Sequence, residues 1–202
     1  MFQHLSRLIQ RIATPARAWA CLALLLATMA LVNLADLPCT GPRLSHLTAG
    51  RTFLDLRWYY TSREAWTAVS GYGPTGRATC LGFYATWDVA IPLLAFGFSA
   101  MALTLLWDHP GPRRCFLLAP SAALGFDLLE NGLLALVILR FPAPSVALAA
   151  AAGVVTALKW VAYALCLGLV AAGAGIYANL SARNRLKPPS LITRRPPCGA
   201  VM

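Results

Sequence analysis

Four long apolar segments, at residues 18–37, 79–107, 116–141 and 146–177, constrain this chain more than any other feature. Each is long enough, at 1.5 Å per residue, to cross a hydrocarbon core of about 30 Å. Of the 202 residues, 58% are hydrophobic and 12% charged, whereas a soluble domain is about half apolar and one quarter charged. The sequence therefore predicts an all-α protein, a four-helix transmembrane bundle, with no room for a soluble catalytic domain beside the spans.

The basic residues of the chain indicate its orientation. There are 17 Lys and Arg against 7 Asp and Glu, which gives a net charge of +10. Many of the basic side chains lie in the N-terminal region 1–17 and in the tail 183–202, and such residues collect near span ends on the cytoplasmic side. We expect a multi-pass protein of the bacterial cytoplasmic membrane with both termini in the cytoplasm, and a lipid bilayer rather than nucleic acid as its partner. We interpret the first apolar segment as a retained span, with a cleaved signal peptide as the alternative.

With this orientation, residues 38–78 form a long extracytoplasmic loop between the first two spans. Thr61 and Glu64 have the spacing of a capping box, which predicts a short helix beginning after Thr61. Aromatic residues on both sides of this helix are typical of a segment that lies on the membrane interface, and a lid over a ligand is the alternative. The tail 183–202 is basic and rich in proline, which predicts disorder.

The most informative residues are the charged and polar side chains inside the predicted spans. An ionised group at the centre of a bilayer costs about 2.5–3.5 kcal/mol, so such groups face the bundle interior and mark functional sites by default. Asp127, Glu130 and Asn131 share one face of the third span, because their spacing is i, i+3, i+4. The candidate ligand or proton site consists of the polar residues of spans two, three and four: Asp88, Asp127, Glu130, Asn131 and Lys159.

Depth counted from the outer span ends predicts how these residues pair. Asp127 and Lys159 lie at one level, about 20 Å deep, and Glu130 and Asp88 lie at another, about 14–15 Å deep. Two carboxyl groups that face each other in a low dielectric share a proton, which is typical of proton relays. The Asp127–Lys159 pair equally fits a structural ion pair between helices. Pro92 lacks the N–H that the Asp88 carbonyl would accept, so we expect a kink beside this acid.

The spacing of cysteine and histidine predicts no metal or cofactor site. The six cysteines include no Cys-x-x-Cys pair and the three histidines are isolated, so we expect neither a metal nor a cofactor. Cys39 and Cys80 lie at the outer ends of the first two spans, where an oxidising compartment permits a disulfide; two unpaired thiols are the alternative. No nucleophile–base motif or phosphate-binding loop identifies a catalytic residue.

Residues 127–131, Asp-Leu-Leu-Glu-Asn, carry a resemblance to other proteins. Together with Asp55-Leu56-Arg57, Gly76-Arg77, Asp88 with Pro92, and Lys159, this string is similar to a group of four-span bacterial integral membrane proteins. The similarity extends from the first loop through the fourth span, and the group has no assigned activity to transfer. A more distant similarity to four-span sterol-isomerase-type proteins consists of intramembrane acids alone, without a motif that matches residue by residue.

These observations leave three hypotheses for the function. The first is a protein that binds or moves a small or lipidic ligand with proton coupling, at a polar site open toward the outer leaflet. The second is a structural or assembly subunit whose buried charges only join helices. The third is an intramembrane enzyme that uses Asp88 and Glu130 as an acid–base pair on a lipid. The sequence favours the first, and it identifies neither the ligand nor the oligomeric state.

Overall fold

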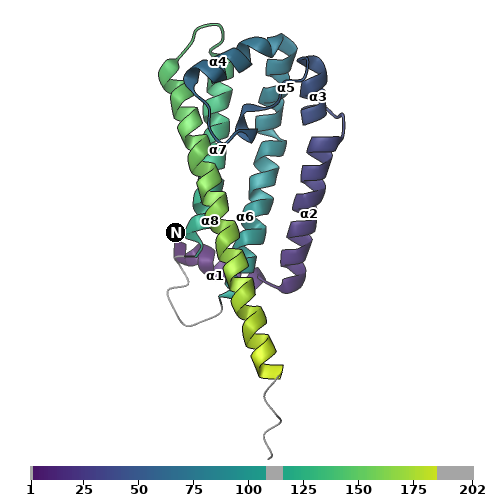
Figure 1. The fold of residues 1–202 in the computed structure, drawn as a ribbon, viewed down its shortest axis with the longest axis vertical. Helices are drawn as coiled ribbons and strands as arrows, with labels where there is room; N and C mark the ends of the chain where they lie inside the picture. The colour runs from purple at the N-terminus through teal and green to yellow at the C-terminus, as the bar shows by residue number, and fades with distance from the viewer. Residues whose placement is uncertain (1, 108–115, 186–202) are drawn as a thin grey trace, which may run out of the picture.

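The computed structural model describes residues 2–107 and 116–185, and every element in these residues is a helix. Four segments are long and apolar enough to cross a membrane: Pro15–Leu34, Gly73–Leu106, Leu118–Leu139 and Val146–Asn179. Figure 1 shows them running along the long axis of the molecule, which confirms the predicted all-α bundle of four spans. In chain order the helices are α1 (Phe2–Ile12), α2 (Pro15–Leu34), α3 (Gly41–Leu47), the 3₁₀ helix η1 (Leu54–Leu56), α4 (Ser62–Gly71), α5 (Gly73–Ala85), α6 (Trp87–Leu106), α7 (Leu118–Leu139) and α8 (Val146–Arg185).

The spans begin and end near the predicted positions, and the differences have local causes. The first span starts at Pro15 instead of residue 18, because the Thr14 side chain caps the first turn and proline fits the first helical position. The fourth span starts at Val146 as predicted and runs to Asn179, just past residue 177, while its helix α8 continues to Arg185, into the start of the predicted tail. The rest of that tail, like the predicted turn after residue 107, lies outside the described residues.

The second span is interrupted just before Asp88, where the sequence predicts one helix over 79–107 with a kink beside this acid. α5 ends one residue before Thr86 and α6 begins one residue after it, and Thr86 itself is not helical. The Thr86 hydroxyl donates to the carbonyl of Gly82 (2.6 Å), a local bond that competes with the regular helical bonds. Pro92 lies inside α6, so the Asp88 carbonyl lacks its helical donor and is available to another helix.

The first loop, residues 35–72 between α2 and α5, folds over one end of the bundle and enters it (Figure 1). The predicted capping box is present: Thr61 Oγ1 accepts from the Glu64 backbone N–H (3.3 Å), and the Glu64 carboxylate accepts from the Thr61 backbone N–H (2.7 Å). Trp58 and Tyr59 are exposed, as an interfacial segment requires, whereas Tyr60 is completely buried. The aromatic segment is therefore interfacial only in part, because its third ring belongs to the bundle core.

A close backbone contact at Gly153 fixes the first loop to α8. A Cβ atom at this position would collide with the carbonyl oxygen of Tyr60, so only glycine allows the approach. The Tyr60 hydroxyl lies 3.2 Å from that of Thr156, about one turn further along α8. One turn beyond, the indole N–H of Trp160 donates to the carbonyl of Arg57 (2.8 Å). The loop thus follows α8 into the bundle.

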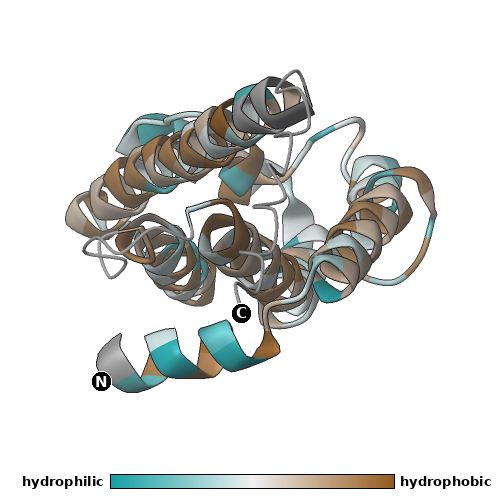
Figure 2. Cartoon of the chain, turned by 90° about the horizontal axis from the view of Figure 1, so that it is seen from below, coloured by the Kyte–Doolittle hydropathy of each residue, from teal (hydrophilic) through white to brown (hydrophobic). Residues whose placement is uncertain are grey.

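At the other end of the bundle, residues 2–12 form the helix α1, where the sequence predicts only a basic region at 1–17. Its hydrophilic and hydrophobic residues alternate along the helix, which lies across the end of the spans (Figure 2). Ile9 is buried with Ala100 and Leu117, while Arg7 and Arg11 are exposed. The apolar spacing of an amphipathic helix explains this arrangement, since one face packs on the bundle and the other is polar.

Candidate functional site

The predicted polar face of α7 lies in the interior of the bundle, against α8. Asp127, Glu130 and Asn131 are all buried, and Glu130 has no exposed surface. They point the same way because residues three and four apart share a helix face. Lys159 of α8 is also buried, with 4% of its surface exposed, so the structure brings the predicted residues of spans three and four together.

Lys159 joins the two acids of α7. Its ammonium group forms an ion pair with Glu130 and another with Asp127, the latter at 3.8 Å. The predicted Asp127–Lys159 pair is present. Glu130 is a second and closer partner of Lys159, whereas the sequence predicts that Glu130 faces Asp88. The difference arises because depth counting gives levels only to about one helical turn, and the flexible four-carbon stem of lysine spans that distance.

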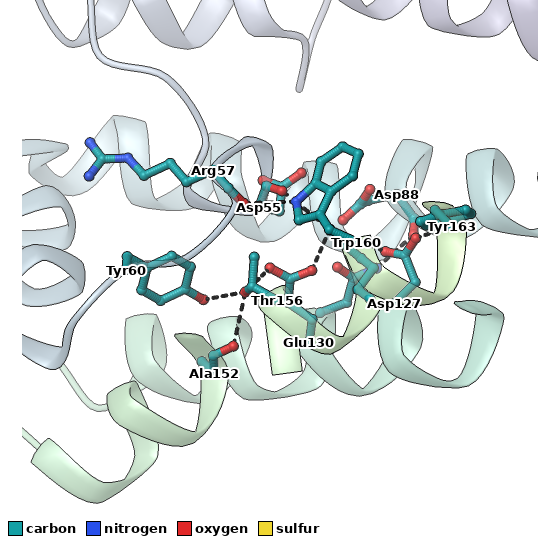
Figure 3. Close-up of polar contacts among 12 residues, drawn as sticks. Asp55, Arg57, Tyr60, Asp88, Asp127, Glu130, Ala152, Thr156, Trp160 and Tyr163 are labelled. Carbon is teal, nitrogen blue, oxygen red and sulfur yellow. Dashed lines mark hydrogen bonds and ion pairs between the residues drawn. The ribbon is translucent and has the colours of Figure 1, made fainter. Parts of the chain in front are cut away.

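Hydroxyl groups of α8 donate to one oxygen of each acid. Thr156 donates to Glu130 Oε1 (2.5 Å), and Tyr163 donates to Asp127 Oδ2 (2.6 Å), as Figure 3 shows. Each acid therefore has both a charge partner and a hydrogen-bond donor, which a buried ion pair needs to offset desolvation. This part of the cluster fixes α7 against α8.

Asp88 contacts α7 through its backbone. Asn131 Nδ2 donates to the Asp88 carbonyl (2.6 Å), the group that Pro92 leaves without a helical donor. The predicted contact between the Asp88 and Glu130 carboxyl groups is wrong, because Glu130 bonds to Lys159 and to a threonine of α8 instead. The carboxyl oxygen Oδ2 of Asp88 is buried and has no hydrogen-bond partner among the described residues.

A fourth acid, Asp55, enters the site from the first loop and is missing from the predicted set. It lies in η1, with 3% of its surface exposed, and its backbone carbonyl accepts from Lys159 Nζ (3.2 Å). Burial raises the pKa of Asp55 from 3.8 to about 7, against the opposing effect of the Lys159 charge. Its apolar neighbours give only a partial sequence signal for burial, because Leu54 is buried whereas Leu56 is half exposed.

A cavity of about 380 Å³ adjoins these acids. Its walls come from α2, α6 and α8 and from the first loop, and they are mostly aliphatic and aromatic, including Leu25, Phe98 and Leu167. Asp55, Asp88, Asp127 and Lys159 also line it, whereas Glu130 does not. The cavity thus combines an apolar body with a charged region.

The predicted disulfide between Cys39 and Cys80 is wrong, since both residues are free thiols. The Cys39 sulfur occupies the space where a Cβ atom of Gly82 would lie, so it sits against the backbone of α5. Cys80, in contrast, is completely buried among apolar side chains of the core. The alternative of two unpaired thiols therefore holds.

Within residues 2–107 and 116–185, no group of three His, Cys, Asp or Glu side chains is placed to hold a metal ion. In the comparisons with known proteins, no family model, no curated protein and no solved structure matches this chain. The resemblance to four-span bacterial membrane proteins stays a prediction.

Proposed function

We propose that this membrane protein binds a small or lipidic amphipathic ligand in the cavity between α2 and α8, with the polar end of the ligand at Asp55, Asp88 and Asp127. The observation that carries the proposal is the combination of an apolar cavity with buried carboxyl oxygens that have no hydrogen-bond partner among the described residues. A buried acceptor without a partner costs about 1–3 kcal/mol, and a bound polar group removes that cost.

The size and lining of the cavity support a ligand of modest length. Its volume of about 380 Å³ lies within the range of about 300–1,000 Å³ that is usual for small-molecule sites. The walls are largely apolar and the polar groups are few and converge at one region, which is the usual arrangement for fixing the orientation of a ligand.

The Asp55 carboxyl supports coupling between ligand binding and protonation. Its pKa of about 7 means that a small change in surroundings alters its charge near neutral pH. A ligand that contacts this carboxyl changes those surroundings, so binding and proton uptake or release are linked.

The structural alternative accounts for only half of the cluster. The bonds of Lys159 and Thr156 to Glu130 are those expected of charges that only join helices. The same explanation leaves the unpaired oxygens of Asp55 and Asp88 at a cavity wall without a reason. A bound ligand gives these oxygens a partner, while the bonds to Glu130 join α7 to α8.

Native mass spectrometry of the purified protein tests the proposal. Ala95 of α6 lines the cavity, and Ala95→Phe fills part of it; the matched control is Ala164→Phe on an exposed face of α8 outside the cavity wall. We expect a retained amphiphile on the wild-type and Ala164→Phe proteins and its loss from Ala95→Phe. Equal retention by all three, or retention by none, contradicts the proposal.

We also propose that the protein lies in the bacterial cytoplasmic membrane with both termini in the cytoplasm. The exposed Arg7 and Arg11 of α1 support this orientation, because basic residues near span ends weigh more than those of a long loop. Membrane-impermeant maleimide added outside the cell should label Arg57→Cys and spare Arg11→Cys. The reverse pattern contradicts the orientation.

A further inference from the structure

The hydrogen-bond donors of the polar cluster are already in use. The ammonium of Lys159 faces Glu130, Asp127 and the Asp55 carbonyl. The remaining donors also point at protein acceptors: Thr156 at Glu130, Tyr163 at Asp127, Trp160 at the Arg57 carbonyl and the Asn131 amide at the Asp88 carbonyl. The cluster therefore has no spare donor from these groups for a ligand.

Several hydrogen-bond acceptors of the polar cluster, in contrast, have no donor. Among the described residues, the buried oxygens Asp55 Oδ1 and Asp88 Oδ2 have no hydrogen-bond partner, and Asp127 Oδ1 has only its 3.8 Å ion pair with Lys159. All three side chains line the cavity and are more than nine-tenths buried. Figure 3 shows these three acids, from three different elements, grouped around Trp160. Four further buried atoms have no hydrogen bond among the described residues, and none of their side chains lines the cavity: the hydroxyls of Tyr84 and Ser121, Asn131 Oδ1, and Glu130 Oε2, which forms the ion pair with Lys159.

The charged groups of the cluster are unbalanced in the same direction, because acidic groups outnumber basic ones. The cluster contains four carboxyl groups, those of Asp55, Asp88, Asp127 and Glu130, and one ammonium group, that of Lys159, which forms ion pairs with Asp127 and Glu130. Glu130, which lies outside the cavity wall, takes the closest ion pair with that ammonium. The acids that face the cavity therefore have the weaker share of its positive charge.

We propose that the polar end of the ligand is a primary or secondary ammonium group, carried on an apolar chain that fills the rest of the cavity. This inference rests on the proposed function and adds the chemical class of the ligand. A primary ammonium offers three N–H donors and no acceptor. It therefore complements the unpaired oxygens of Asp55 and Asp88 and the Asp127 oxygen that has only a 3.8 Å ion pair. Charge-assisted bonds of this kind are about twice as strong as neutral ones.

Competition binding tests the headgroup. The protein is placed in nanodiscs of zwitterionic lipid at pH 8, above the pKa of Asp55, with radiolabelled dodecylammonium as the probe and the Ala95→Phe protein as the background. Unlabelled dodecylammonium, dodecyltrimethylammonium, dodecanol and dodecanoate, all with the same chain length, are the competitors. We expect saturable binding, with dodecylammonium displacing the probe at concentrations about tenfold to a hundredfold below dodecanol. Dodecyltrimethylammonium falls between them, because it has the charge without N–H donors.

Variants of the acids tie the preference to the site. Asp88→Asn should weaken dodecylammonium binding about tenfold or more, since an amide replaces a carboxylate. Asp127→Asn is a second variant with the same expectation if the first does not fold. The control is Asp36→Asn, at a half-exposed aspartate near the end of α2 that pairs with His46, and it should bind as the wild type does.

The outcomes separate the two proposals. Equal or better displacement by dodecanol or dodecanoate, no saturable binding of the probe, or unchanged binding in folded Asp88→Asn and Asp127→Asn overturns the ammonium headgroup. Equal displacement by dodecyltrimethylammonium overturns the need for N–H donors. If Ala95→Phe still retains the amphiphile in native mass spectrometry, the ligand lies elsewhere and the proposed function itself falls.

Discussion

Replacing Lys159 with methionine removes the cation that faces both acids of α7. The side chains of Lys159 and Glu130 have 5% and 0% of their surface exposed, so water cannot take the place of the lost ammonium. Removing one partner of a buried ion pair costs about 3–5 kcal/mol, because the other charge stays buried without compensation. Methionine has a similar length, which keeps the loss of packing small. We expect Lys159→Met to lower the free energy of unfolding by about 4 kcal/mol.

A double-mutant cycle separates this charge effect from a simple packing defect. Lys159→Met combined with Glu130→Gln should recover at least about 2 kcal/mol, since glutamine is neutral and keeps an oxygen for the Thr156 hydroxyl. The assay is reversible unfolding in mixed micelles, followed by circular dichroism. Arg63→Met is the control, because this exposed basic residue should change stability by less than about 0.5 kcal/mol. A single mutant within about 1 kcal/mol of wild type, or a double mutant no more stable than the single, would show that the Lys159 charge does not stabilise the buried acids.

Two further predictions concern the first loop. The folded-state pKa of Asp55, about 7, lies above its unfolded value of 3.8, so deprotonation of this carboxyl favours unfolding. The free energy of unfolding should therefore fall by up to about 4 kcal/mol from pH 4 to pH 8. Chemical unfolding at a series of pH values measures this slope, and Asp55→Asn should flatten it. An unchanged slope in Asp55→Asn would contradict the role of this acid. Gly153→Leu should destabilise the protein by about 1–3 kcal/mol, because the new side chain meets the Tyr60 carbonyl. Gly168→Leu on the same helix is the control, because its side chain enters open space and should not destabilise the protein. Thermal unfolding of both variants measures the difference, and equal effects would rule out the close contact.

Helical periodicity made the polar face of α7 predictable from the sequence. Asp127, Glu130 and Asn131 are close in the chain, and the cost of burying charge in a membrane forces them inward. The Asp127–Lys159 pair follows from the lengths of two adjacent spans joined by a short turn. Local spacing and hydrophobicity were sufficient for these elements.

Other parts of the site depend on contacts that no local pattern reports. Asp55 reaches Lys159 only because a loop enters the bundle along α8, and that path depends on the missing side chain at Gly153. The choice of Lys159 over Asp88 as the partner of Glu130 depends on how far one side chain extends across a helical turn. By contrast, the apolar spacing of Leu5, Ile9 and Ile12 could have predicted α1 before the structure was known.

The position of a bound amphiphile shows whether the cavity between α2 and α8 is the binding site. Photo-cross-linking of the purified protein with a dodecylammonium that carries a diazirine near the end of its chain, followed by peptide mass spectrometry, reports which side chains surround the tail. We expect cross-links to the cavity walls at Leu22, Leu25 and Leu167, and their loss in Ala95→Phe. Cross-links confined to the exposed side chains Leu139 and Leu165, outside the cavity, with no change in Ala95→Phe, would contradict this binding site.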